Sequence, residues 1–182
     1  MTHFMIDVET TGLNPGVNHI TSCAIVSFEL ETGLYGEDFF HERLRTDFGS
    51  RARNADTIGW RNQHGIDKAE ADLAIRDSVQ ITIKTINDFL FRNSSEDVPI
   101  VWAKPAHFDI AFLESYFREV NLRIPWSHRN VRDLATYLMA AGHDLTELYD
   151  EIEFSGDPHN ALHDCHYQIL LANLGYQSLH KN

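Results

Sequence analysis

Cysteine is scarce in this chain of 182 residues, and long hydrophobic runs are missing. Cys23 and Cys165 both stand in apolar surroundings, which favours reduced, buried thiols in a cytoplasmic protein. No apolar run reaches the roughly 18–20 residues that span a bilayer, so we expect no membrane partner. The first residues also lack the basic region and apolar stretch of a signal peptide, and we therefore expect a cytoplasmic location.

Positive charge is the other shortage. Lysine and arginine together number 15 against 27 aspartates and glutamates, which gives a formal net charge of −12. This balance argues against a protein that coats nucleic acid passively, because such binding depends on cations that neutralise phosphates. It does not argue against a metal-dependent phosphodiesterase, since bound cations reverse the sign of the charge at an acidic site.

Hydrophobic residues make up 43% of the chain and charged residues 23%, as in an ordinary globular protein. The length suits one domain over residues 1–182, and no repeat, low-complexity segment or linker interrupts it. Residue patterns predict an antiparallel meander of strands 3–8, 19–28 and 34–44, a loop 46–54, helices 56–63 and 70–92, a buried strand 98–102, and helices 108–120, 132–141 and 160–175. This order predicts an α/β fold in which a mixed sheet is covered by helices.

Asp7 and Glu9 are the most informative pair in the sequence. They stand two residues apart in a segment predicted as a strand, so their side chains share one face, roughly 6.5–7 Å apart along it. Two carboxylates so placed repel each other unless a cation lies between them, and Mg²⁺ and Mn²⁺ prefer oxygen ligands. The alternative is a solvated strand end with two acids, since so short a pattern recurs by chance.

Two further aspartates stand where a ligand-binding acid is expected. Asp109 follows the predicted strand 98–102 at the entry to a helix, and open α/β sheets bind ligands at such strand ends. Its alternative role is a helix-start acid that interacts with the macrodipole. Asp164 borders the apolar stripe of the last helix, where an unpaired charge is expensive, so it needs either a metal or an arginine as its partner.

A histidine precedes the last of these acids. If Asn160 caps the final helix, His159 lies in the preceding loop and can act there as a general base. Its alternative is an ordinary surface or core histidine. In a rival arrangement, His159, His163 and His166 share one helical face and bind zinc, which requires an earlier helix start and leaves the other acids unexplained. The sequence shows neither a glycine-rich phosphate cradle nor a Ser or Cys nucleophile elbow.

Three motifs therefore follow one another along the chain: Asp7-x-Glu9-Thr10-Thr11-Gly12-Leu13, Phe108-Asp109 and His159-x-Ala161-x-x-Asp164. Together they resemble the ordered motifs of DnaQ-like 3′–5′ exonucleases, and the histidine is typical of the DEDDh branch. The resemblance implies a ribonuclease H-like mixed sheet in a single domain. It also implies two Mg²⁺ or Mn²⁺ ions per active site, held by Asp7, Glu9, Asp109 and Asp164, with His159 as general base.

The resemblance extends to the substrate. The turn after Glu9 would seat the 3′-terminal nucleotide, and aromatic rings can stack on any base. The expected substrate contacts are Thr10, Thr11, Gly12, Leu13, Trp60, Gln63 and Phe108; Trp102 could also stack, although its strand suggests a core position. Pro105 departs from the asparagine that many members carry, which puts one substrate contact in doubt but not metal binding. Asp133 resembles a structural position of such proteins.

The segment 57–63 and the lack of further domains resemble small bacterial and phage exoribonucleases more than proofreading subunits of polymerases. We therefore predict hydrolysis from the 3′ ends of RNA or DNA, with RNA favoured, to nucleoside 5′-monophosphates. A homodimer is implied by the resemblance only. Two alternatives stay open: a catalytically silent nucleic-acid-binding or scaffold domain with the same fold, and a phosphodiesterase limited to very short oligonucleotides.

Overall fold

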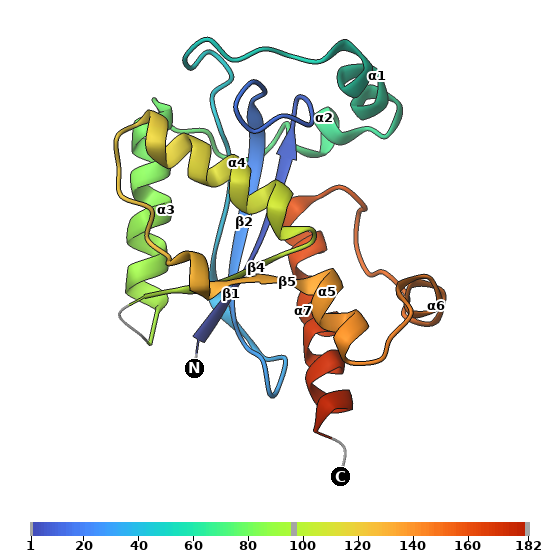
Figure 1. Cartoon of the computed structure of the whole chain (residues 1–182). Helices are drawn as coiled ribbons and strands as arrows, with labels where there is room; N and C mark the ends of the chain where they lie inside the picture. Colours follow the sequence, from blue (N-terminus) through green and yellow to red (C-terminus); the bar gives the residue numbers. More distant parts are fainter. Residues whose placement is uncertain (1, 96–97, 181–182) are drawn as a thin grey trace.

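A five-stranded mixed sheet forms the centre of the computed structural model, which describes residues 2–95 and 98–180 (Figure 1). The strand order is β3-β2-β1-β4-β5; the first three strands are antiparallel, and β4 and β5 run parallel to β1. The strands are β1 (Thr2–Thr10), β2 (Ile20–Glu29), β3 (Tyr35–Arg43), β4 (Ile100–Ala103) and β5 (Val131–Asp133). The predicted meander and mixed α/β sheet are confirmed.

Helices cover both faces of this sheet. They are α1 (Ala55–Gln63), α2 (Ile66–Ala69), α3 (Val79–Asn93), α4 (Ala106–Glu119), α5 (Leu134–Ala140), α6 (Leu145–Glu151) and α7 (Ala161–Leu179), with a short 3₁₀ turn at His128–Asn130. Helices α3 and α4 cover one face and α5 and α7 the other, while α1 and α2 lie beyond one end of the central strands (Figure 1). Within the described ranges, no helix has the length and apolarity needed to cross a membrane.

The alternation of side chains along β1 decides which residues meet which helices. Phe4, Ile6 and Val8 are buried in the core that includes α3 and α4. Met5 is buried in the opposite core, with residues of α5 and α7. Since side chains two residues apart share a face, Asp7 continues the row of Met5 toward α7.

The prediction of a helix over residues 70–92 is wrong for residues 70–78. Helix α3 begins at Val79, because the Ser78 hydroxyl caps it by accepting a hydrogen bond from the backbone N–H of Ile81 over 3.3 Å. Ile75 instead forms an isolated bridge with Arg43 and is half-exposed, so it does not belong to the buried stripe of this helix. The later positions of the predicted stripe are buried as expected.

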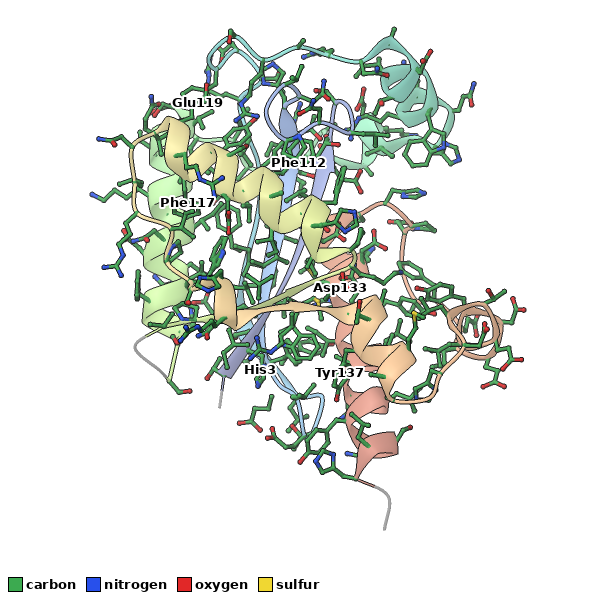
Figure 2. The ribbon with its side chains drawn as sticks, in the orientation of Figure 1. His3, Phe112, Phe117, Glu119, Asp133 and Tyr137 are labelled. Carbon is green, nitrogen blue, oxygen red and sulfur yellow. The ribbon has the colours of Figure 1, made fainter. Side chains whose placement is uncertain are left out.

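The predicted helix 132–141 begins too early, and Asp133 explains why (Figure 2). The chain forms β5 before α5 begins, and Asp133 Oδ1 caps α5 by accepting from the backbone N–H of Thr136 over 2.8 Å. Its Oδ2 accepts from the backbone N–H of Ala106 over 2.8 Å, which ties the start of α4 to the start of α5. The short helices α2 and α6 were not predicted.

Trp102 lies in the core and cannot stack on a substrate base. It is 2% exposed, and its indole N–H donates to Nδ1 of His3 over 2.8 Å. The rings of His3 and Tyr137 contact it, with centroid distances of 5.8 and 5.1 Å (Figure 2). Burial lowers the pKa of His3 to about 4, so its ring is neutral and free to accept this hydrogen bond at neutral pH.

Candidate active site

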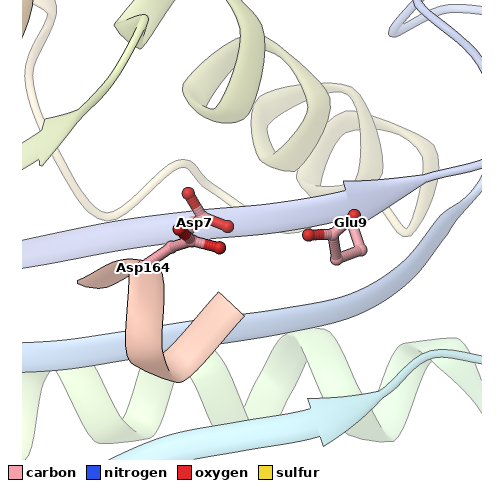
Figure 3. A group of neighbouring side chains, drawn as sticks. All are labelled: Asp7, Glu9 and Asp164. Carbon is pink, nitrogen blue, oxygen red and sulfur yellow. The ribbon is translucent and has the colours of Figure 1, made fainter. Parts of the chain in front are cut away.

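Three carboxylates from two distant segments converge beside the sheet. Asp7 and Glu9 project from the same side of β1, and Asp164 comes from the first turn of α7 (Figure 3). Each offers one oxygen, and these oxygens lie within 4.8 Å of one another. The period of the strand places the first two on one face, as predicted, and the packing of α7 on β1 adds the third.

A fourth carboxylate, Asp109, lies in the first turn of α4 and is 3% exposed. Its Oδ1 accepts a hydrogen bond over 3.0 Å from the backbone N–H of Val8, the residue between Asp7 and Glu9. Its Oδ2 is buried and has no hydrogen-bond partner among the described residues. A buried acceptor without a partner is costly in a folded protein, and a bound cation would satisfy it.

Burial disfavours the ionised form of all four acids and so raises their pKa values. It raises the pKa of Glu9 to about 8, that of Asp109 to about 7 and that of Asp164 to about 6. Burial also raises the pKa of Asp7 far above its ordinary value, and the charges of the three neighbouring carboxylates add to the effect. A cluster of acids that repel one another is the electrostatic situation that a divalent cation relieves.

Three other side chains near the acids were not found from the sequence. Gln168 is 5% exposed and donates from Nε2 to Asp7 Oδ1 over 2.8 Å. The charge of Lys104 lowers the pKa values of Asp109 and Asp164 against the effect of burial. Arg61 lies 3.5 Å from Glu9, measured from Nη1 to Oε2.

Only one of these three carried a usable signal. Gln168 follows Asp164 by one helical turn and interrupts the apolar stripe of α7, and a polar residue in an apolar stripe needs a buried partner. Lys104 precedes Asp109 by five residues, but its proximity to Asp164, like that of Arg61 to Glu9, depends on the tertiary structure.

His159 lies in the turn before α7, as predicted. The side chain of Asn160 caps the helix by accepting from the backbone N–H groups of Leu162 and His163. His159 itself has φ 63°, in the left-handed region that non-glycine residues rarely occupy. Its backbone N–H hydrogen-bonds Asp164 and lowers the pKa of that carboxyl, which ties the turn to the acidic cluster.

Two aromatic side chains of the α1 region pack around this imidazole. The ring of His159 meets Trp60 edge-on at a centroid distance of 4.8 Å and His64 at 5.6 Å. Burial and the neighbouring charge of His64 lower the pKa of His159 below its ordinary 6.5. The ring is therefore neutral near pH 7 and able to accept a proton.

The rival zinc arrangement is wrong. Helix α7 begins after His159, His163 Nδ1 accepts from the backbone N–H of Asp157 over 2.9 Å, and His166 stacks on Tyr35. In the part of the chain that the structure describes, the only group of three or more converging ligand residues is the carboxylate cluster described above.

The turn after β1 is built from the residues predicted to contact substrate. Thr10 and Thr11 are buried, and their hydroxyls donate to the backbone carbonyls of Gly12 over 2.7 Å and Ala52 over 3.1 Å. At Gly12 a Cβ would lie 2.4 Å from the side chain of Asn18, so the turn requires glycine there. The two hydroxyls thus hold the turn itself.

The other expected substrate contacts differ in their exposure. Leu13 is 78% exposed and Trp60 is 42% exposed, so both offer apolar surface to solvent. Gln63 is exposed at the end of α1. Phe108 is half-buried and packs on Phe112 with a centroid distance of 4.9 Å. It therefore lies at the edge of the hydrophobic core, next to Asp109 in the sequence.

Comparison of the sequence with known proteins gives one family match. A sequence model of the Rv2179c-like domain, described as a 3′-5′ exoribonuclease domain, matches residues 2–174. No curated protein sequence matches the chain significantly.

Several solved nucleases have a similar fold. Cell-death related nuclease 4 (CRN-4) has a TM-score of 0.69 at 15% identity, over 97% of this chain and 63% of its own. E. coli exonuclease I in complex with a dT13 oligonucleotide has a TM-score of 0.71 at 15% identity, over 95% and 40%. The nuclease domain of 3′hExo, a DEDDh family member bound to rAMP, has a TM-score of 0.62 at 19% identity, over 97% and 92%. The chain thus spans less than two thirds of the first two proteins, and these likenesses concern the fold.

Proposed function

The chain belongs to the family of the Rv2179c-like 3′-5′ exoribonuclease domain, and on that premise we propose that it is a metal-dependent 3′–5′ exonuclease that favours RNA. The observation that carries this proposal is the convergence of Asp7, Glu9 and Asp164 within 4.8 Å, beside the buried Asp109. A silent member of the fold would have no need for four carboxylates that repel one another, one of them buried and the other three partly buried.

The side chains present fit a pair of Mg²⁺ or Mn²⁺ ions. All the donor atoms are carboxylate oxygens, which these hard cations prefer, and the buried Oδ2 of Asp109 has no hydrogen-bond partner among the described residues. Asp7, Glu9, Asp109 and Asp164 would hold the ions. When bound, two such ions lower the pKa of an attacking water and stabilise the charge on the leaving oxygen.

The other residues supply the remaining chemistry. His159, neutral near pH 7, accepts the proton of the attacking water at a ring nitrogen. Attack at phosphorus displaces the 3′ oxygen of the penultimate nucleotide and releases a nucleoside 5′-monophosphate. The turn Thr10–Leu13 directly follows Glu9, and the exposed ring of Trp60 packs against His159; both would contact the terminal nucleotide.

The family description supports RNA as the favoured substrate. The solved structures support nucleic acid in general, since exonuclease I was captured with a DNA oligonucleotide and 3′hExo with rAMP. Discrimination between the two depends on contacts to the 2′-hydroxyl, so it is decided by experiment. A homodimer stays a prediction from the resemblance.

The test uses purified protein with 5′-labelled RNA and DNA oligomers in Mg²⁺, in Mn²⁺ and in EDTA. We expect a ladder that shortens from the 3′ end with metal, faster on RNA, and none in EDTA. Asp7→Asn should abolish the ladder. The matched control is Asp88→Asn, which changes an exposed aspartate of α3 and should leave the ladder unchanged.

Two results would redirect the proposal. Undiminished degradation by Asp7→Asn, or in EDTA, contradicts the metal-dependent mechanism. A series of substrates from dinucleotides to long oligomers separates a general exonuclease from a phosphodiesterase of very short oligonucleotides, because the latter loses activity steeply as the chain lengthens.

A further inference from the structure

Arg61 places a buried positive charge behind the acidic cluster. Its side chain is 1% exposed, in a protein with a net charge of −12. Nη1 lies 3.5 Å from Glu9 Oε2 and donates to the backbone carbonyl of Thr10 over 3.3 Å. The guanidinium therefore contacts both the carboxylate of Glu9 and the backbone that follows it.

Two further acids hold the other edges of the same guanidinium. Nε and Nη2 donate to Asp67 Oδ1 over 2.9 and 2.7 Å, and Nη2 also donates to Glu70 Oε2 over 2.8 Å. With all three nitrogens engaged, the plane of the guanidinium has little freedom to rotate. Arg61 is thus a fixed part of the site.

Glu70 connects Arg61 to strand β2 of the central sheet. It is 4% exposed, and its Oε1 accepts hydrogen bonds from Thr21 Oγ1 over 2.8 Å and Ser22 Oγ over 2.7 Å. Ser22 lies opposite Glu9 in the β1–β2 ladder. Glu9 contacts Arg61, Arg61 contacts Glu70, and Glu70 contacts Ser22. Because Glu9 and Ser22 are paired between β1 and β2, these interactions form a closed network anchored on two neighbouring strands.

We propose that Arg61 is a positioning residue that holds the Glu9 carboxylate in the place where it binds metal, an inference that rests on the proposed function. Glu9 needs such support because its flexible side chain is repelled by the charges of Glu70, Asp164 and Asp109. The separation of 3.5 Å exceeds an ordinary hydrogen bond, so the contact orients Glu9 and leaves its oxygens available for a cation.

A simple counter-charge would behave differently from a positioning residue. If Arg61 only neutralised the acids, removing its charge would strengthen cation binding and Arg61→Lys would change nothing. A positioning role depends on the planar fork, which lysine lacks although it keeps the charge. Arg61→Lys should therefore weaken metal binding by roughly 10–100-fold, the usual effect of losing a residue that orients a ligand.

The experiment measures Mn²⁺ binding by calorimetry, and by the spin-resonance signal of free Mn²⁺, well below the unfolding temperature of each variant. Arg61→Lys is compared with Glu70→Gln, which keeps the side-chain size but weakens the far anchor and should lose affinity in the same direction. The matched control is Arg51→Lys. Arg51 is also buried, at 4% exposure, and pairs with Glu119 at 2.7 Å, but none of its contacts is with the four acids.

We expect wild-type protein and Arg51→Lys to bind Mn²⁺ equally, and Arg61→Lys to bind it more weakly. Equal or tighter binding by Arg61→Lys, with wild type binding normally, overturns the inference and leaves the proposed function standing. If Arg61→Lys does not fold, unchanged affinity in Glu70→Gln overturns it instead. Absence of Mn²⁺ binding by the wild type contradicts the proposed function itself, and the positioning role with it.

Discussion

The side-chain amide of Gln168 donates a hydrogen bond to Oδ1 of Asp7 over 2.8 Å, and both groups are buried or nearly so. This bond joins α7 to β1 at an acid whose pKa burial raises well above its ordinary value. It favours the ionised carboxylate and so lowers a pKa that burial and three neighbouring acids raise. The Oε1 atom of Gln168 is buried without a hydrogen-bond partner among the described residues.

Replacing Gln168 with methionine should shift the pH dependence of activity toward higher pH. Loss of the donor raises the pKa of Asp7 further, so a higher pH is needed before the carboxylate is free to bind metal. We expect the acidic limb of the kcat/KM profile to move to higher pH, because the pKa of Asp7, which burial already raises, rises further. Gln177→Met, at an exposed position of the same helix, is the control; superimposable profiles for the two variants would contradict this role.

The metal-free protein should lose stability as the pH rises from about 6.5 to about 8. The acids have ordinary pKa values of 3.8 and 4.5, but in the folded state Asp109 and Glu9 titrate at about 7 and about 8. The folded protein therefore binds more protons than the unfolded chain, so its stability falls as the pH rises, until the folded protein has released these protons as well. Thermal unfolding in EDTA, measured across this range, tests the slope.

The histidines define the lower limit of that pH range. Burial lowers the pKa values of His3 and His41 from 6.5 to about 4, and such groups make stability rise with pH, opposing the acids below pH 6.5. Above it they are neutral in both states. Mg²⁺ should stabilise most near pH 8, where it replaces the lost protons. Glu9→Gln should flatten the metal-free slope, and an equal slope in that variant would count against the assignment.

His159→Ala should slow hydrolysis by roughly 10²–10⁴-fold while leaving Mn²⁺ affinity unchanged. The reason is that the imidazole lies outside the carboxylate cluster and would act on a proton, whereas the four acids hold the cation. Single-turnover rates and Mn²⁺ titration measure the two quantities separately. His128→Ala, at an exposed histidine in the 3₁₀ turn, is the control. A variant with full activity would show that another group takes the proton.

Trp60→Ala should reduce kcat far more than it reduces stability. The ring is 42% exposed, so its removal uncovers little core, but it packs 4.8 Å from His159 and 4.3 Å from His64, centroid to centroid. Trp60→Phe should recover part of the rate, since it restores an aromatic edge. Phe91→Ala, at a 48% exposed aromatic residue of α3, is the control for stability, which urea unfolding measures. Parallel losses of rate and stability in Trp60→Ala would indicate a purely structural ring.

The features that the sequence predicted correctly depend on neighbours within a few residues. The strand period places Asp7 and Glu9 on one face, Asn160 caps α7 and leaves His159 in the preceding turn, and Asp109 lies in the first turn of α4. Each follows from backbone geometry and from hydrogen bonds within one turn. Where a local signal was overlooked, at the Ser78 cap, the predicted helix began too early.

The amino-acid sequence alone therefore determined the type and order of the main elements and the identity of the acids, because periodicity and capping act over short distances. Only the tertiary structure decided what surrounds those acids. Arg61, Lys104 and Gln168 reach Glu9, Asp164 and Asp7 from segments far along the chain. Coulombic and hydrogen-bond interactions depend on distance in space, and that distance exists only once helices α1, α4 and α7 have packed around β1.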